Sequence, residues 1–142
     1  MPKVIRDVAV PHGPRDMFDL VNDIERYPEF LPWCDGASIL SRDDNVVTAS
    51  LLLSRSGVQS RFSTRNRNVE DRQIEIELLD GPFDHLRGRW TFEPVAKKTR
   101  VALELRYRFS NPLLGLVLGG VVEDVATELV DAFRLRAIDV YA

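Results

Sequence analysis

The sequence predicts an α+β fold, in which one long C-terminal helix packs on the concave face of an antiparallel sheet of about seven strands. Between residues 37 and 109, about six extended segments follow one another with short turn signals between them. Strands joined by short turns form an antiparallel meander, and helices kept apart from the strands are typical of the α+β class. From Pro112 onward the apolar residues recur at helical spacing, so we expect a helix to the end of the chain.

Residues 3–24 predict one further strand and the start of a helical segment, and we expect short helices between the first two strands. Lys3 to Val10 alternates as a strand, and the turn residues Pro11 and Gly13 end it. Pro14 suits the first turn of a helix, where a missing N–H costs little. The apolar residues that follow have helical spacing: Met17, Phe18, Leu20, Val21 and Ile24.

The stretch DIERYPEFLPWC at 23–34 is the most distinctive part of the chain. Its aromatic residues Tyr27, Phe30 and Trp33 alternate with Pro28 and Pro32. Proline does not continue a helix interior, and the residue before it favours extended geometry. We therefore predict a stiff connector without regular structure, which covers an apolar pocket as a lid or an entrance.

Turn residues separate the remaining strands. Asp43-Asp44-Asn45, Gly57, Glu70-Asp71, Asp80-Gly81-Pro82 and Lys97-Lys98 are the turn signals. The strands are expected to begin near Ala37 and to cover 46–53, 58–69, 74–78, 86–92 and 100–109.

Alternation assigns the strand side chains to two faces of the sheet. The apolar face, which should meet the helix, carries Phe62, Ile74, Ile76, Leu78, Leu86, Trp90, Phe92, Val101, Leu103, Leu105, Tyr107 and Phe109. The outer face carries Arg61, Arg65, Arg67, Arg87, Arg89, Arg106 and Arg108 with Glu75, Glu77 and Glu104. The helix stripe that should face the sheet is Leu114, Leu118, Val121, Val125, Leu129 and Phe133.

The net charge of −3 is unevenly distributed along the chain. Residues 55–110 have a balance of +4, whereas residues 1–54 have −4 and residues 111–142 have −3. One interpretation is a solvated sheet face with cross-strand ion pairs. The other is a patch that binds phosphate groups of a nucleic acid or of lipid headgroups.

The sequence predicts a single domain over 1–142 in a reducing compartment. The first residues lack the apolar run of a signal peptide, and no segment approaches ~20 uninterrupted apolar residues. Cys34 is the single cysteine, so no internal disulfide forms. We therefore expect a cytoplasmic protein. The alternative is a protein that associates peripherally with the inner membrane.

The chemistry-bearing residues predict neither catalysis nor a metal site. His12 and His85 are the two histidines, and neither has a metal-ligand spacing with Cys34. His12 is expected at the surface, and His85 either at the surface or at a cavity rim. Cys34 is expected to be a packing thiol. The Gly119-Gly120 pair lies within the helical segment and lacks the flanking pattern of a phosphate-binding loop. We expect no enzyme activity and no required cofactor.

An apolar ligand pocket is better supported than a catalytic site. The aromatic residues of the inner face are core in one interpretation and cavity wall in the other. The helix opposite them contains small residues, namely Gly119, Gly120, Ala126 and Ala132, which leave space against a curved sheet. The glycine pair can also weaken or kink the helix and so gate entry. Leu113 to Leu118 is either buried under the aromatic connector or exposed at a pocket mouth that touches a bilayer.

Several motifs resemble one known family along nearly the whole chain. They are LVNDIERYPEFLPWC at 20–34, FSTRN at 62–66, LLDGPFDHLRGRWTFEP at 78–94, FSNPLL at 109–114 and LVDAFRLRAIDVYA at 129–142. Together they are similar to the ribosome-association toxins of the RatA type and their relatives, the coenzyme Q-binding proteins. Both groups belong to the START-like, polyketide-cyclase superfamily.

The resemblance implies a helix-grip fold, with a curved sheet around the C-terminal helix and a cavity for an apolar ligand between them. For the coenzyme Q-binding branch it implies non-catalytic binding of a polyprenyl quinone, such as ubiquinone, in support of respiration. For the RatA branch it implies binding to the large ribosomal subunit and a block of subunit association. We expect no DNA binding.

The two alternatives place their sites on opposite faces. The residues expected to contact the ligand in the cavity or at its entrance are Tyr27, Phe30, Trp33, Phe62, Thr64, Trp90, Phe92, Tyr107, Leu118, Val121, Val125 and Leu129. A ligand headgroup is expected to meet Thr64, Asn66 or Tyr107. The ribosome contact is expected from Arg61, Arg65, Arg67, Arg87, Arg89, Arg106 and Arg108.

Overall fold

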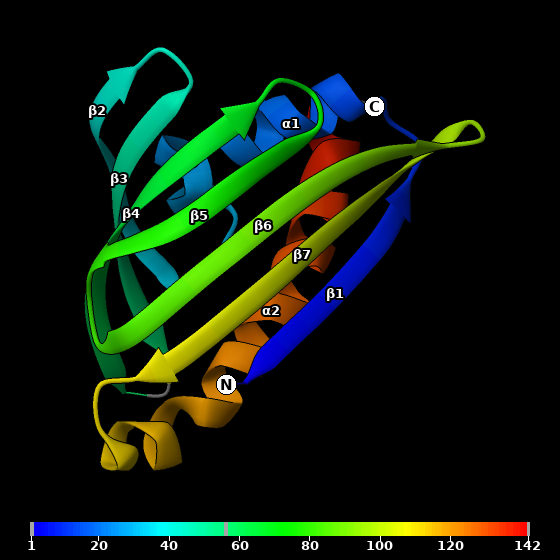
Figure 1. Cartoon of the computed structure of the whole chain (residues 1–142). Helices are drawn as coiled ribbons and strands as arrows, with labels where there is room; N and C mark the ends of the chain where they lie inside the picture. The colour runs from blue at the N-terminus through cyan, green and yellow to red at the C-terminus, as the bar shows by residue number, and fades with distance from the viewer. Residues whose placement is uncertain (1, 56, 142) are drawn as a thin grey trace.

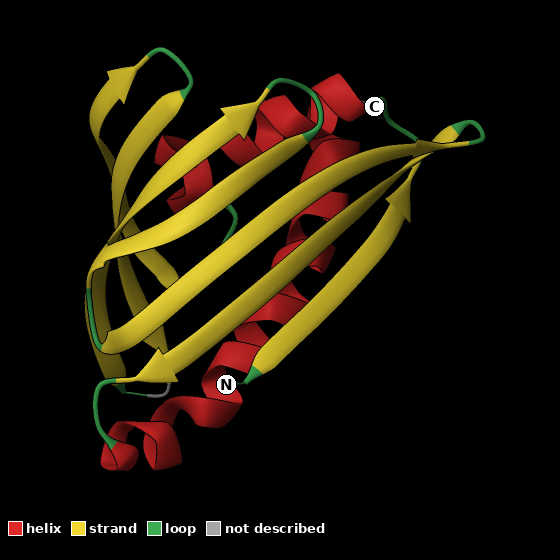
Figure 2. Cartoon of the chain, viewed as in Figure 1, coloured by secondary structure: helices red, strands yellow, loops and turns green. Residues whose placement is uncertain are grey.

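The computed structural model describes residues 2–55 and 57–141, and for Arg55, Val58, Leu118 and Gly119 it describes the backbone alone. Its elements in chain order are β1 (Lys3–Val10), α1 (Pro14–Asn22), the 3₁₀ helix η1 (Ile24–Glu29), β2 (Cys34–Asp43), β3 (Val46–Arg55), β4 (Val58–Val69), β5 (Gln73–Asp80), β6 (Phe83–Val95), β7 (Lys98–Phe109) and α2 (Pro112–Tyr141). Figure 2 shows that the helices lie on one side of the sheet.

The sheet has seven strands in the order β1-β7-β6-β5-β4-β3-β2, and every neighbouring pair is antiparallel. The sheet curves so that its strands wrap around α2, which runs behind β6, β7 and β1 in the view of Figure 1. This arrangement confirms the predicted α+β class, the strand number and the position of the last helix.

The core lies between the concave face of the sheet and the helices. From α2 it receives Val125, Ala126, Val130, Phe133 and Ala137, all buried. Helix α1 contributes Met17, Phe18, Leu20 and Val21. The predicted inner face is confirmed, because its side chains are buried or half-buried while the arginines opposite them are mostly exposed.

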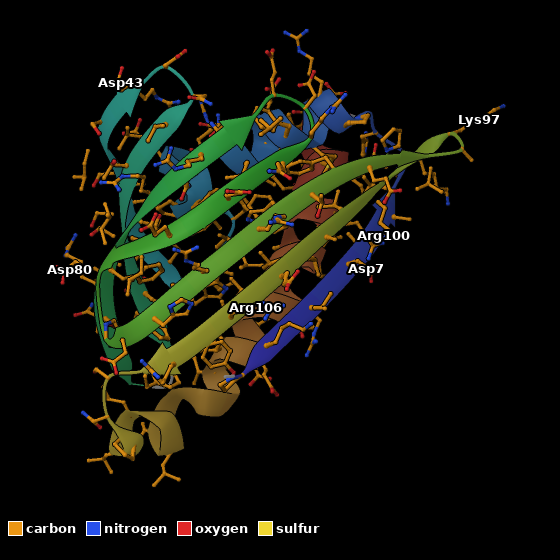
Figure 3. All side chains as sticks on the ribbon, viewed as in Figure 1. Asp7, Asp43, Asp80, Lys97, Arg100 and Arg106 are labelled. Atoms are coloured by element: carbon orange, nitrogen blue, oxygen red, sulfur yellow. The ribbon has the colours of Figure 1, made fainter. Side chains whose placement is uncertain are left out.

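The first strand closes one edge of the sheet by pairing with the last. Lys3 lies opposite Arg106 and Val10 lies opposite Thr99. The Arg100 Nε lies 2.8 Å from Asp7 Oδ2 across this pair, and Figure 3 shows the two side chains pointing toward each other. Residues 11–33 therefore connect the two opposite edges of the sheet.

The connector at 23–34 differs from the prediction. Residues Ile24–Glu29 form a 3₁₀ helix, with Pro28 inside it. The backbone hydrogen bonds avoid the proline nitrogen, because Arg26 N–H donates to Asp23 O and Phe30 N–H donates to Tyr27 O. A short 3₁₀ turn has φ values close to those of proline, so it tolerates the residue that would break a longer α-helix.

Strand boundaries were also predicted too short at several places. β2 begins at Cys34 and not near Ala37, and β6 covers Phe83–Val95 and not 86–92. β6 is longer than predicted because its backbone stays paired with β7 at both ends. Phe83 lies opposite Phe109, and Val95 lies opposite Lys98. Side-chain alternation does not report such pairing at strand ends.

Candidate ligand cavity and outer basic face

A cavity of about 170 Å³ lies between the sheet and α2. Its wall comes from α1, η1, Trp33, β3–β7 and α2, and most of it is apolar. It includes the aromatic residues Tyr27, Trp33, Phe62, Phe83, Trp90 and Phe109, and the α2 residues Val121, Val122, Val125 and Leu129. The cavity is smaller than the ~300–1,000 Å³ of pockets that enclose a drug-sized ligand. It is comparable with an engineered apolar cavity of about 150 Å³ that binds benzene.

Apart from Tyr27 and from Trp33, whose buried Nε1 has no hydrogen-bond partner in the described chain, the polar side chains of the wall come from β4. Thr64 and Asn66 are buried, and Thr64 Oγ1 donates a hydrogen bond of 3.0 Å to Asn66 Oδ1. Ser60 of the same strand also lines the cavity. Among the lining residues that the structure describes there is no Asp, Glu, Lys, Arg or His. The cavity therefore offers hydrogen bonds but no charge.

Tyr27 fixes the entrance segment to helix α1. Its phenolic O–H donates a hydrogen bond to Val21 O, and the ring packs against Phe30 and Phe133. Burial raises the pKa of Tyr27 well above its usual value, so the phenol stays neutral. The connector thus acts as a fixed wall of the cavity.

Most of the predicted ligand contacts lie in the cavity wall. These are Tyr27, Trp33, Phe62, Thr64, Trp90, Val121, Val125 and Leu129. The side chain of Leu118, also a predicted contact, lies outside the described residues.

Three predicted contacts lie away from the cavity wall. Phe30 follows the end of η1 and packs on Phe133 at 5.3 Å between ring centres. Phe92 is buried against Phe18 of α1 at 5.9 Å. Tyr107 packs against the cavity residues Phe83 and Phe109 and forms a layer behind them. Alternation assigned Phe92 and Tyr107 to the correct face, but their position along that face depends on where α1 and α2 cross the sheet.

The wall from β3 was not among the predicted contacts. Ala49, Leu51 and Leu53 line the cavity from this strand. Their i, i+2, i+4 spacing is the signal that could have identified them, since alternate residues of a strand share one face.

Gly120 does not help to create the cavity as predicted. Gly120 is exposed, and a Cβ added there would meet no atom within 4 Å. For Gly119 the structure describes the backbone alone, so this part of the prediction lies outside the described residues. The space is left by valines of α2, namely Val121, Val122 and Val125, which face a strongly curved sheet.

The first turns of α2 were expected either to lie buried under the aromatic connector or to be exposed at a pocket mouth. Leu113, Leu116 and Val117 are 69%, 85% and 56% exposed, so this apolar segment is not covered by the aromatic connector. A Cβ added at Gly115, in the same turns, would lie 3.7 Å from the ring of Phe109, which lines the cavity. The exposed apolar residues therefore adjoin one end of the cavity.

The outer face carries a row of cations across neighbouring strands. Lys3 of β1 lies opposite Arg106 of β7, which lies opposite Arg87 of β6. The row continues through Glu77 of β5 to Arg65 of β4. Like charges directly opposite each other in a sheet are destabilising. A row with three adjacent cations is thus kept at some cost to stability.

The next row on the outer face is balanced. Arg67, Glu75, Arg89 and Glu104 alternate in charge across β4 to β7. Arg89 pairs with Glu75 at 3.6 Å, and Arg106 reaches back to Glu104 at 3.1 Å. In the described part of the chain, no ion pair involves Arg65, Arg67 or Arg87. The cross-strand ion pairs of the first interpretation are therefore present on part of the face, whereas phosphate binding stays a prediction.

The remaining reactive groups form no second site. His12 is half-buried and not exposed as expected, because its ring packs against Tyr141 at 5.7 Å between ring centres, and His85 is half-buried as well. Cys34 is buried, and burial raises the pKa of its thiol. No cluster of His, Cys, Asp or Glu within the described ranges could hold a metal ion. No helix of the described chain has both the length and the apolar character needed to cross a membrane.

The fold and the cavity define a helix-grip domain of the START type. The chain belongs to the family described as polyketide cyclase / dehydrase and lipid transport, which matches residues 10–134. The ribosome association toxin RatA of Escherichia coli (strain K12) is 38% identical over 143 residues, which cover 100% of this chain and 90% of that protein. The mitochondrial coenzyme Q-binding protein COQ10 homolog B of Xenopus laevis is 26% identical and covers 88% of this chain and 53% of its own length.

Solved structures agree on the fold. A START superfamily protein from Mycobacterium smegmatis superposes with a TM-score of 0.80 at 24% identity and covers 96% of this chain and 97% of its own. The Zhui aromatase/cyclase from Streptomyces superposes with a TM-score of 0.81 at 16% identity and covers 96% and 93%. These similarities confirm the START-like fold and leave the activity to be argued from the site.

Proposed function

We propose that this chain binds an isoprenoid quinone of the ubiquinone type, or a lipid with a similar ring, and does so without catalysis. The observation that supports it best is the uncharged cavity of about 170 Å³, with its aromatic wall and its Thr64–Asn66 pair. A coenzyme Q-binding protein among the relatives supports the same ligand class.

The size of the cavity suggests how a long lipid is held. The ring occupies the cavity, and the isoprenoid tail leaves past Phe109 along Leu113 and Leu116. Each buried CH₂ contributes about 0.8 kcal/mol, so about ten buried carbon groups of the ring and the tail supply the roughly 8 kcal/mol of micromolar binding. The exposed apolar turns of α2 would then contact the inner membrane while the ligand is exchanged.

Mass spectrometry of an organic extract from the purified protein tests this function. We expect a quinone in a stoichiometric amount, or full occupancy after addition of ubiquinone-1. A protein that carries no lipid and also fails to bind added ubiquinone-1 would overturn the proposal.

A second candidate function is association with the large ribosomal subunit, with a block of subunit joining. Two observations favour it: the row formed by Lys3, Arg106 and Arg87, and the RatA relatives that match the whole chain. Contacts of these cations with RNA phosphates would release counterions, so binding should weaken steeply as salt rises. Co-sedimentation with isolated large subunits at increasing salt tests this candidate.

A further inference from the structure

Asn66 occupies a position where packing alone favours another residue. It lies on the inner face of β4, opposite Val47 of β3 and Ile76 of β5, and is 8% exposed. Asparagine is depleted in strands, and burying an amide without hydrogen-bond partners costs free energy. A β-branched apolar residue would fit between Val47 and Ile76, so the amide itself needs an explanation.

The hydrogen bond with Thr64 orients this amide. Thr64 Oγ1 donates to Asn66 Oδ1 at 3.0 Å, so the carbonyl end of the amide is engaged. In the described part of the chain, the Asn66 Nδ2 group donates to no other residue. The side chain lines the cavity, so the wall presents an oriented donor whose acceptor is not part of the protein.

We propose that Asn66 is the residue that selects the ligand's polar group, and that the cavity takes neutral rings bearing a carbonyl oxygen and rejects carboxylates. This inference rests on the proposed lipid-binding function and narrows it. A carbonyl oxygen accepts a hydrogen bond from Nδ2 without bringing a charge into the cavity.

A fatty acid fits the same cavity poorly for an electrostatic reason. Burying a carboxylate without a cation is strongly unfavourable, and the described wall offers none. The neighbouring Arg65 and Arg67 belong to the outer face, since successive strand residues point to opposite sides. They cannot neutralise an anion held at Asn66 unless β4 leaves its register.

Tryptophan fluorescence provides the measurement, because Trp33 and Trp90 both line the cavity. The probes are ubiquinone-1, p-xylene as a ring without carbonyl groups, and palmitate. For the wild type we expect tight binding of ubiquinone-1, weaker binding of p-xylene and little binding of palmitate. Asn66→Leu should weaken ubiquinone-1 about tenfold, as expected for loss of one buried hydrogen bond, and leave p-xylene unchanged.

A second variant keeps the test informative if Asn66→Leu does not fold. Thr64→Val preserves shape but removes the hydroxyl that orients the amide, and it should weaken ubiquinone-1 by a smaller factor of about three. Thermal unfolding in the absence of ligand checks both variants for folding.

The outcomes distinguish a failure of the role proposed for Asn66 from a failure of the proposed lipid-binding function. Ubiquinone-1 that binds Asn66→Leu as tightly as the wild type overturns the role of Asn66 and leaves quinone binding intact. Palmitate that binds the wild type as tightly as ubiquinone-1 overturns the selection against carboxylates. A wild type that binds none of the three probes overturns the proposed function and this inference with it.

Discussion

The guanidinium carbon of Arg136 lies 5.0 Å from the centre of the Phe30 ring. The same side chain places Nη2 3.0 Å from Glu29 Oε1. These contacts join α2 to the end of η1 across 107 positions of the chain, beside the aromatic wall of the cavity. A planar guanidinium can stack on a ring and pair with a carboxylate at the same time, which a lysine ammonium does less well.

Arg136→Lys should therefore destabilise the protein by about 1 kcal/mol, because the stacking is lost while the charge remains. Arg134→Lys is the matched control, since Arg134 pairs with Asp131 within the same helix and is more exposed. Urea unfolding measures both. Equal losses for the two variants would show that the contact with Phe30 contributes nothing specific.

Val121→Trp should lower lipid uptake more than stability, because Val121 borders unfilled space. Val130→Trp is the comparison, since Val130 is buried in the packed part of the same helix. Overpacking a filled core costs about 1–3 kcal/mol. Uptake of ubiquinone-1 and thermal unfolding are measured for both. If Val121→Trp loses about 1–3 kcal/mol of stability and keeps its uptake of ubiquinone-1, the region beside Val121 is packed core and not a ligand cavity.

Reversal of Arg65, Arg67, Arg87 and Arg89 to Glu should abolish co-sedimentation with large ribosomal subunits and leave quinone binding intact. These residues line the outer depression of the sheet and point away from the cavity. A control variant reverses Arg15 and Arg134, which lie on the helices. Wild-type protein that stays in the supernatant even at low salt would remove the ribosome candidate.

Gly81→Ala and Gly120→Ala should change stability in opposite directions. Gly81 has φ 154°, and a Cβ there would lie 2.8 Å from the Cβ of the cavity residue Phe62. We expect a loss of about 1–3 kcal/mol from this strain. Gly120 lies exposed in α2 with open space around it, so alanine should stabilise the helix by about 1 kcal/mol. Denaturant unfolding measures both, and a shared sign would contradict the argument.

Stability should fall as pH rises above about 8.5, the usual pKa of a cysteine thiol. Burial raises the pKa of Cys34 in the folded state, so the unfolded state loses its proton first. The contribution of the protonated thiol to the free energy of unfolding is therefore fully present below the pKa of the unfolded state. It is lost as pH rises toward the pKa of the folded state. Cys34→Ala should move the onset of this loss of stability toward pH 10. Near that pH, the tyrosines whose pKa is raised in the folded state begin to lose their protons in the unfolded state. Unfolding curves between pH 7 and pH 11 give the comparison.

The order of the elements and the two faces of the sheet could be predicted from the sequence, because strand alternation is a strictly local signal. It assigned Trp90 inward and Arg89 outward correctly. The form of the connector could not be predicted, since a 3₁₀ turn around Pro28 depends on anchors such as the bond from Tyr27 to Val21 O. That bond has no signature in spacing.

The cavity wall was predicted only in part, for a geometric reason. Alternation says which side a residue faces, but not how far along the curved sheet the helices cross it. Phe92 and Tyr107 were therefore assigned to the cavity although they pack beside and behind it. The donor group of Asn66 is significant only once the hydrogen bond from Thr64 is known.

The pairing of β1 with β7 has a consequence for the time course of folding. Val8 lies opposite Val101, so β1 leaves the ribosome long before its partner β7 has been synthesised. The hairpins from β2 to β7 can form in sequence, whereas β1 closes the longest loop of the molecule. Contacts between such distant segments slow folding. The edge of β7 therefore stays open longest, and a chain interrupted before Lys98 would leave its first strand permanently unpaired.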